Sequence, residues 1–206
     1  MRGQRAVMAA ARALSFVSRP YYVPVSLFVS LFTFTGLRLL PAGYKLWVTG
    51  LAWAFTVALP RLCVWLWRRL NGWAPAQLRQ RERRAVPYVL FLLSYAGGLQ
   101  LMWGLHLPRY MCGIVVAALL VQAVGAVVNV WWKISMHCAG AGGLVGALVA
   151  YSALFGFDPT GWLCVLILLC GAVGTARMLL RQHSLGQVVA GTLVGAAASL
   201  AGILWL

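Results

Sequence analysis

Apolar runs long enough to cross a membrane recur along this 206-residue chain, and they restrict its fold more than any other feature. A helix needs about 20 predominantly apolar residues to cross the hydrocarbon core of a bilayer. Hydrophobic residues make up 63% of the chain and charged residues only 9%, far outside the range of soluble domains. The alternating pattern of an outer-membrane strand is absent. The sequence therefore predicts an all-α fold, a polytopic membrane helix bundle.

The apolar runs predict about seven transmembrane helices, divided by a basic linker at residues 68–86. Two helices precede the linker within residues 20–67, and Pro60 predicts a kink in the second. Residues 1–19 carry four arginines among apolar side chains, which predicts a basic amphipathic helix lying on the membrane. The seven predicted spans are residues 22–40, 46–67, 87–107, 110–132, 137–155, 160–180 and 184–206.

Small residues recur at four-residue spacing in two of the late spans. Gly142 and Gly146 form one such pair, and Gly191 and Gly195 form another. Pairs of this kind let the backbones of neighbouring membrane helices approach closely. They predict a tight bundle in the second half of the chain.

The charge balance is strongly one-sided, with 17 lysines and arginines against two acids, Glu82 and Asp158. A basic excess can indicate nucleic acid. Here the cations lie between apolar runs, so anionic lipid headgroups are the expected partners and nucleic acid is not. Metal-dependent phosphate chemistry normally needs several carboxylates. Two acids far apart in the sequence therefore predict no metal site and no cofactor.

Seven spans would place the N-terminus, the 68–86 linker and both candidate site segments on one side of the membrane. That side holds ten arginines outside the candidate site, four in residues 1–19 and six in the linker, whereas the other side holds Arg38, Lys45 and Arg109. The positive-inside rule then predicts that the site faces the cytoplasm. Residues 1–19 lack the apolar region and cleavage site of a signal peptide, which suits a bacterial inner membrane.

The most informative polar residues of the sequence lie at the boundary between the last two spans. Arg177 closes one span and His183 opens the next, with Arg181 between them and Gln187 one turn further on. A helix N-terminus favours an anion, and a neutral imidazole can attack phosphorus when its other nitrogen is held by an acceptor. The amide oxygen of Gln187 can be that acceptor. Arg181 is expected either to help bind the phosphate or to contact lipid headgroups.

A second group of polar residues, Lys133-Ile-Ser135-Met-His137, borders the preceding helical hairpin. Together the two groups offer cations, a nucleophile and a proton donor but no carboxylate, an inventory that suits a phosphate group. Ionisable residues at the edge of a bilayer core are costly to place and usually mark a site. The alternative is that these side chains only anchor helix ends at the interface.

At these residues the chain resembles the type-2 phosphatidic acid phosphatase superfamily, over roughly residues 87–206. That family carries Lys-x6-Arg-Pro, Pro-Ser-Gly-His and Ser-Arg-x5-His-x3-Asp. The third motif matches at Arg177 and His183, with Ala176 in place of Ser and Gln187 in place of Asp. The second matches at Ser135 and His137, with Ile134 in place of Pro and Met136 in place of Gly. The first motif is not found as written, and Lys133 is its best stand-in. Dolichyl-diphosphatase-like members similarly have His-x3-Gln.

The resemblance implies a metal-independent membrane phosphatase acting on a polyprenyl (di)phosphate or phosphatidate-type lipid through a phosphohistidine. His183 would be the nucleophile and His137 the general acid, while Lys133, Arg177 and the Ser135 region would bind phosphate oxygens. Two alternatives remain. Gln187 in place of a carboxylate would suit a weak or inactive lipid-phosphate-binding protein, and a transporter is disfavoured because few polar residues lie within the spans.

Overall fold

The computed structural model describes residues 2–72 and 85–205, and every regular element among them is a helix. The all-α prediction is therefore confirmed. The α-helices are α1 (Arg2–Val17), α2 (Val23–Phe34), α3 (Ala42–Trp53), α4 (Leu59–Leu70), α5 (Ala85–Gly104), α6 (Arg109–Trp131), α7 (Met136–Phe155), α8 (Thr160–Leu179) and α9 (Leu185–Leu204). Short 3₁₀ turns form η1 (Pro20–Tyr22) and η2 (Gly36–Leu39), and a π-helical turn forms η3 (Ala54–Ala58).

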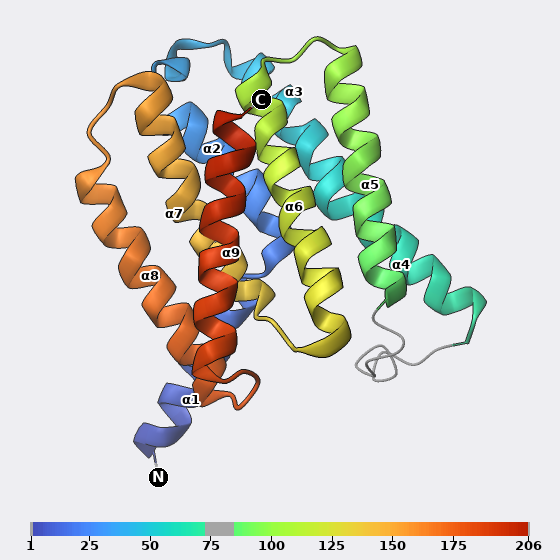
Figure 1. The fold of residues 1–206 in the computed structure, drawn as a ribbon, viewed down its shortest axis with the longest axis vertical. Helices are drawn as coiled ribbons and strands as arrows, with labels where there is room; N and C mark the ends of the chain where they lie inside the picture. Colours follow the sequence, from blue (N-terminus) through green and yellow to red (C-terminus); the bar gives the residue numbers. More distant parts are fainter. Residues whose placement is uncertain (1, 73–84, 206) are drawn as a thin grey trace.

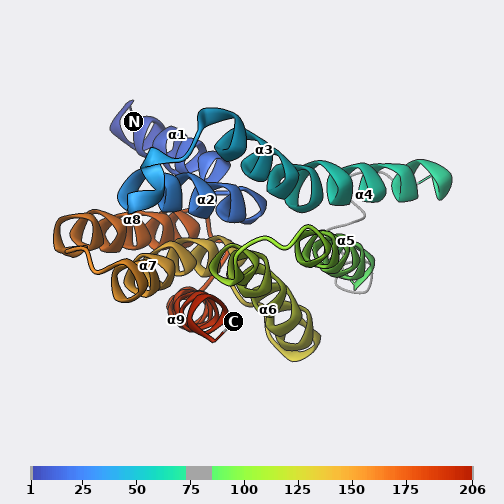
Figure 2. The ribbon, with the colours of Figure 1, turned by 90° about the horizontal axis from the view of Figure 1, so that it is seen from above.

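The helices form a bundle in which the two halves of the chain lie against each other. Figure 1 shows α5–α9 running up and down side by side, and Figure 2 shows α1–α4 along one side of them. Helix α7 is the most buried of the spans and packs against α9, α8 and α2. The core between α2, α6 and α7 contains fully buried aromatic and aliphatic side chains such as Phe28, Ile114 and Tyr151.

Six helical stretches of the described chain are long and apolar enough to cross a membrane. Five are α5–α9, and the sixth is the continuous stretch Ala42–Leu70 formed by α3, η3 and α4. The predicted first span, residues 22–40, is instead the shorter apolar helix Pro20–Phe34. Helix α2 ends at Thr35, whose extended backbone and hydroxyl begin the η2 turn. The predicted count of about seven thus corresponds to six long helices and one short one.

The predicted kink at Pro60 takes the form of a π-helical turn directly before it. A proline inside a helix removes one amide donor and crowds the preceding turn. In the π register the carbonyl of Phe55 would accept from residue 60, which has no N–H. The Ser94 hydroxyl of α5 donates to that carbonyl at 2.6 Å instead. This bond ties the distorted turn to α5 and gives the Phe55 carbonyl a partner inside the bundle.

Both predicted small-residue pairs lie in the contact between α7 and α9. A methyl group on Gly195 or Gly191 of α9 would overlap the backbone of Ala139 or Ser135 on α7, and one on Gly142 or Gly146 of α7 would overlap the backbone of α9. Backbone contact of this kind supplies the close packing that replaces the hydrophobic driving force inside a bilayer. It also fixes the N-terminal ends of α7 and α9 beside each other.

Candidate functional site

A pocket of about 590 Å³ lies at the end of the bundle where α6 and α8 end and α7 and α9 begin. One part of its wall is polar and the other part is apolar. The polar lining comes from α6, the α6–α7 connection, α7, α8 and the α8–α9 connection. The apolar lining comes from η1, α5 and the start of α7. The lining residues are Pro20, Pro87, Tyr88, Phe91, Gln122, Asn129, Lys133, Ile134, Met136, His137, Arg177, Gln182 and His183.

Four of the residues predicted from sequence line this one pocket: Lys133, His137, Arg177 and His183. Arg177 and His183 lie within electrostatic range of the His137 imidazole. The four come from two segments, 133–137 and 177–183, that meet because α7 and α8 form one hairpin. The pocket therefore brings together two cationic side chains and two imidazoles, all of which can donate hydrogen bonds.

Arg177 is the most constrained of the four. Its side chain is only 8% exposed, although it lies in the last turn of α8. The Nη1 atom donates to the Ser15 hydroxyl of α1 at 2.8 Å, and the Nε atom is buried without a hydrogen-bond partner among the described residues. An ionised donor that is buried and unpaired costs several kcal/mol, on the order of a lost charged hydrogen bond or more. A bound anion would remove that cost.

The His183 imidazole is held in a defined tautomer by the first turn of α9. Ser184 and Gln187 form a capping box, in which the Ser184 amide donates to the Gln187 Oε1 atom at 3.2 Å. Because that oxygen faces an N–H donor, it is the acceptor for His183 Nδ1, 3.1 Å away. In the neutral imidazole the Nδ1 atom therefore carries the proton, and Nε2 carries the lone pair. The predicted pairing of Gln187 with His183 is present in this form.

The loops that carry the site are tied together by backbone contacts. Lys133 Nζ donates to the carbonyl of Gln182 at 2.9 Å, and the amide of Ser135 donates to the carbonyl of Gln187 at 3.3 Å. The amide of Gln182 in turn donates to the carbonyl of Arg177. These bonds connect the α6–α7 loop to the α8–α9 loop and hold the pocket closed at one side.

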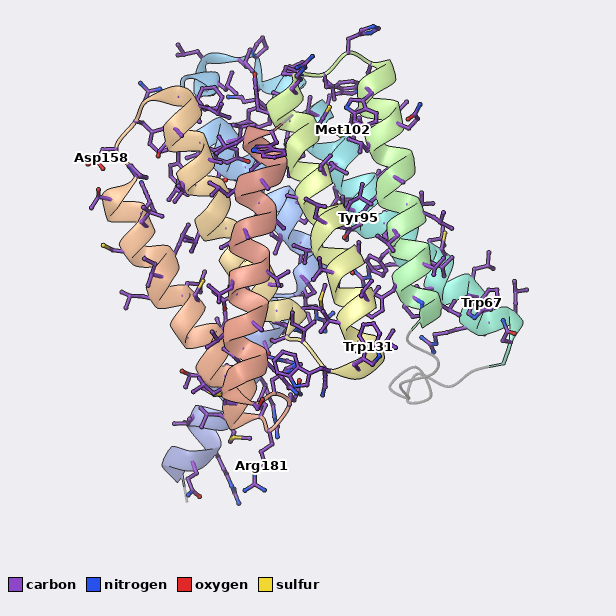
Figure 3. The ribbon with its side chains drawn as sticks, in the orientation of Figure 1. Trp67, Tyr95, Met102, Trp131, Asp158 and Arg181 are labelled. Atoms are coloured by element: carbon purple, nitrogen blue, oxygen red, sulfur yellow. The ribbon has the colours of Figure 1, made fainter. Side chains whose placement is uncertain are left out.

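Three predicted site residues do not line the pocket: Gln187, which follows His183 in the chain and contacts its imidazole, Ser135 and Arg181. Ser135 is fully buried, and its hydroxyl accepts from the amide of Cys138 as the N-cap of α7. Arg181 is exposed and adopts a left-handed backbone with φ of 51° at the end of α8. Its side chain extends away from the bundle in Figure 3. Arg181 therefore has the placement expected for a contact with lipid headgroups.

Sequence reasoning missed the two amides that line the pocket from α6. Gln122 and Asn129 are seven residues apart, two helical turns, and so lie on one face of an otherwise apolar helix. Gln122 is only 9% exposed and hydrogen bonds with the side chain of Tyr95 on α5. The signal was present in the sequence, because amides within a membrane span are rare and usually functional.

The described residues contain no cluster of three or more His, Cys, Asp or Glu side chains that would hold a metal ion. Asp158, labelled in Figure 3, lies just before the first residue of α8, whereas Arg177 lies in the last turn of that helix. Glu82 is outside the described residues. The side chain and amide of Thr160 donate to Asp158 and lower the pKa of its carboxyl group. That carboxylate accepts from the first amide of α8 and does not line the pocket.

Comparison of the chain with protein-family models, curated proteins and solved structures found no match. The resemblance to the type-2 phosphatidic acid phosphatases therefore stays a prediction that depends on the motif residues. The chain has a cationic pocket at one end of a membrane helix bundle, with no carboxylate among the described lining residues. The lining includes both polar and apolar side chains.

Proposed function

We propose that this pocket binds the phosphate of a membrane lipid and hydrolyses it, without a metal ion, through a covalent intermediate on His183. The substrate class is a polyprenyl (di)phosphate or phosphatidate-type lipid phosphate. The observation that carries the proposal is the buried Arg177, whose Nε donor has no partner in the described chain and which lines a pocket with two histidines and a lysine. These donors match the oxygens of a phosphate group. None of the described lining residues is a carboxylate, the group that would favour a metal ion or another cation.

The proposed chemistry follows from the positions of the nitrogen atoms. The lone pair of His183 Nε2 attacks phosphorus, and the bond from phosphorus to the leaving oxygen breaks; that oxygen belongs to the lipid alcohol in a monophosphate and is the bridging oxygen in a diphosphate. His137 takes up a proton when the anionic substrate binds beside it and gives that proton to the leaving oxygen. Water then attacks the phosphohistidine while neutral His137 takes one of its protons, the bond from phosphorus to His183 Nε2 breaks, and inorganic phosphate leaves. Arg177 and Lys133 balance the charge on the phosphate oxygens, and the Gln187 amide oxygen holds the imidazolium that develops on His183.

The mixed lining of the pocket supports an amphiphilic substrate rather than a free sugar or nucleotide phosphate. Pro87, Tyr88 and Phe91 of α5 and Pro20 of η1 supply apolar lining to the same pocket as the cationic residues. A lipid phosphate bound with its phosphorus near His183 would place the first carbons of its chain against this apolar wall. The chain would then leave directly into the bilayer.

The direct test is release of inorganic phosphate by the purified protein in detergent, from farnesyl diphosphate, longer polyprenyl diphosphates and phosphatidate, with EDTA present. We expect release from at least one lipid at a rate that EDTA does not change, because no carboxylate cluster is available to hold a metal. Loss of turnover in EDTA, restored by a single added divalent metal, would contradict the metal-independent mechanism.

A second candidate function is a non-catalytic lipid-phosphate binder. It is favoured by one observation: the acceptor that holds His183 is a neutral amide and not a carboxylate. A neutral acceptor stabilises the developing imidazolium less than a carboxylate would. Saturable binding of a lipid phosphate with no phosphate release from any lipid in the panel would favour this function over the hydrolase.

The two arginines of the α8–α9 region are expected to behave differently. Arg177→Ala removes a buried donor to the phosphate, so kcat/KM should fall by roughly 10²–10³-fold. Arg181→Ala removes an exposed side chain outside the pocket and should change kcat/KM by less than about threefold. Steady-state kinetics on both variants decides this. Equal losses would mean that the cations act through general attraction of an anionic substrate.

The site end is proposed to face the cytoplasm of a bacterial inner membrane. The α1, α4, α6–α7 and α8–α9 ends, with most of the described arginines, lie at this end, and Arg38 lies at the other. An Arg181→Cys variant should react with a membrane-impermeant maleimide only after intact cells are permeabilised, whereas Arg38→Cys should react without permeabilisation. The reverse labelling pattern would place the site outside.

A further inference from the structure

The N-terminal helix contributes a side chain to the site, although residues 1–19 were expected only to lie on the membrane. Ser15 of α1 is the acceptor for Arg177 Nη1, across 162 positions in the sequence. The backbone of Ser15 is also within hydrogen-bonding reach of the His137 imidazole. One residue of α1 thus touches two of the four predicted residues that line the pocket.

Packing on both sides fixes the position of Ser15. Ala11 and Leu14 of α1 pack against the last turns of α8, around Ala176. On the other side, the guanidinium of Arg19 lies 4.1 Å from the Phe16 ring centroid, and the next residue, Pro20, already lines the pocket. The end of α1 is therefore clamped between α8 and the pocket wall.

Ser15 contacts one particular nitrogen of the Arg177 guanidinium, and this choice determines which edge of the guanidinium can bind a ligand. A guanidinium is planar and presents its N–H groups in a rigid fork. Nε and Nη2 point the same way along one edge, and that edge matches two oxygens of a phosphate in a bidentate pair. Ser15 holds Nη1, and the buried Nε remains unpaired in the described structure. The contact leaves the Nε–Nη2 edge for the anion.

We propose that Ser15 is a positioning residue: its hydroxyl orients the Arg177 guanidinium so that the Nε–Nη2 edge meets the phosphate group. This inference rests on the proposed phosphate site. It makes α1 part of the binding machinery, and it links the docking of the N-terminal helix to phosphate affinity.

The test is the Kd for inorganic phosphate, measured by isothermal calorimetry on the full chain in detergent. Ser15→Ala should weaken binding about 10-fold, the effect of losing one hydrogen bond to a charged group. Ser15→Thr retains the hydroxyl and should stay within about twofold of the wild type. Ser18→Ala is the matched control, because the Ser18 hydroxyl donates only to the Leu14 carbonyl within α1. Loss of folded protein lowers the measured stoichiometry and leaves Kd unchanged.

The Arg177→Lys background distinguishes two explanations for a loss of phosphate affinity in Ser15→Ala. One is a lost orientation of the Arg177 guanidinium, and the other is a general disturbance of α1. Lysine keeps the charge but has no Nη1 atom, so Ser15→Ala in that background should leave Kd unchanged. An unchanged Kd for Ser15→Ala in the wild-type background, or an equal loss in both backgrounds, would overturn the inference and leave the phosphate site intact. Absence of phosphate binding by the wild type would overturn the site itself, and the inference with it.

Discussion

Replacement of His183 by alanine is expected to reduce phosphate release to the background rate, a loss of roughly 10⁴–10⁶-fold in kcat. The proposed mechanism has no other route to the covalent intermediate, and His183 Nε2 is the nitrogen left unprotonated by the Gln187 contact. Phosphate release from the best lipid of the panel, followed by colour assay over hours, measures the loss.

His106→Ala is the matched control for this variant. His106 lies between α5 and α6 at the end of the bundle away from the pocket and should tolerate the change with little effect on kcat. A His183→Ala protein that keeps even a tenth of the wild-type rate would exclude a nucleophilic role for His183. Binding of inorganic phosphate to the same variant reports whether the pocket remains folded.

His137→Ala should lower kcat by about 10²–10⁴-fold, the usual contribution of a general acid. The reason is that the alkoxide of a lipid monophosphate is a poor leaving group without a proton from His137, so the comparison uses a lipid monophosphate such as phosphatidate. The defect should shrink on p-nitrophenyl phosphate, because nitrophenolate leaves without protonation. Rates on both substrates for the wild type and the variant test this.

A loss of equal size on p-nitrophenyl phosphate and on the lipid would contradict the general-acid role of His137. It would instead indicate that the imidazole helps to bind the phosphate. Arg181→Ala, outside the pocket, provides the control for non-specific effects of a change at the site end.

The helices of the C-terminal half could be predicted within a few residues, because long apolar runs bounded by Pro108, Pro159 and polar loops leave little choice of where a membrane helix ends. The close backbone contacts that Gly142 and Gly195 make between α7 and α9 followed from the four-residue spacing of the glycines. Lys133, His137, Arg177 and His183 gather in one pocket because two helical hairpins with short loops bring their segments to the same end.

Other features could not be predicted from local pattern. The Ser15–Arg177 contact depends on how α1 packs on α8, and nothing in the sequence near Ser15 distinguishes it from Ser18. The first span proved shorter than predicted because Thr35 ends α2, although apolar residues continue beyond it. The outward placement of Arg181 follows from a left-handed backbone that usually favours glycine.

The most direct test of the central claim, that the pocket hydrolyses a phosphate through His183, is to trap the covalent intermediate. The wild-type protein and the His137→Ala variant are incubated with a ³²P-labelled lipid phosphate in EDTA, quenched in alkali and digested for mass spectrometry. We predict an acid-labile, alkali-stable phosphate on the peptide that contains His183, and none in His183→Ala. Rapid release of phosphate with no label on His183 in either protein, or equal labelling of His183→Ala, would contradict the account.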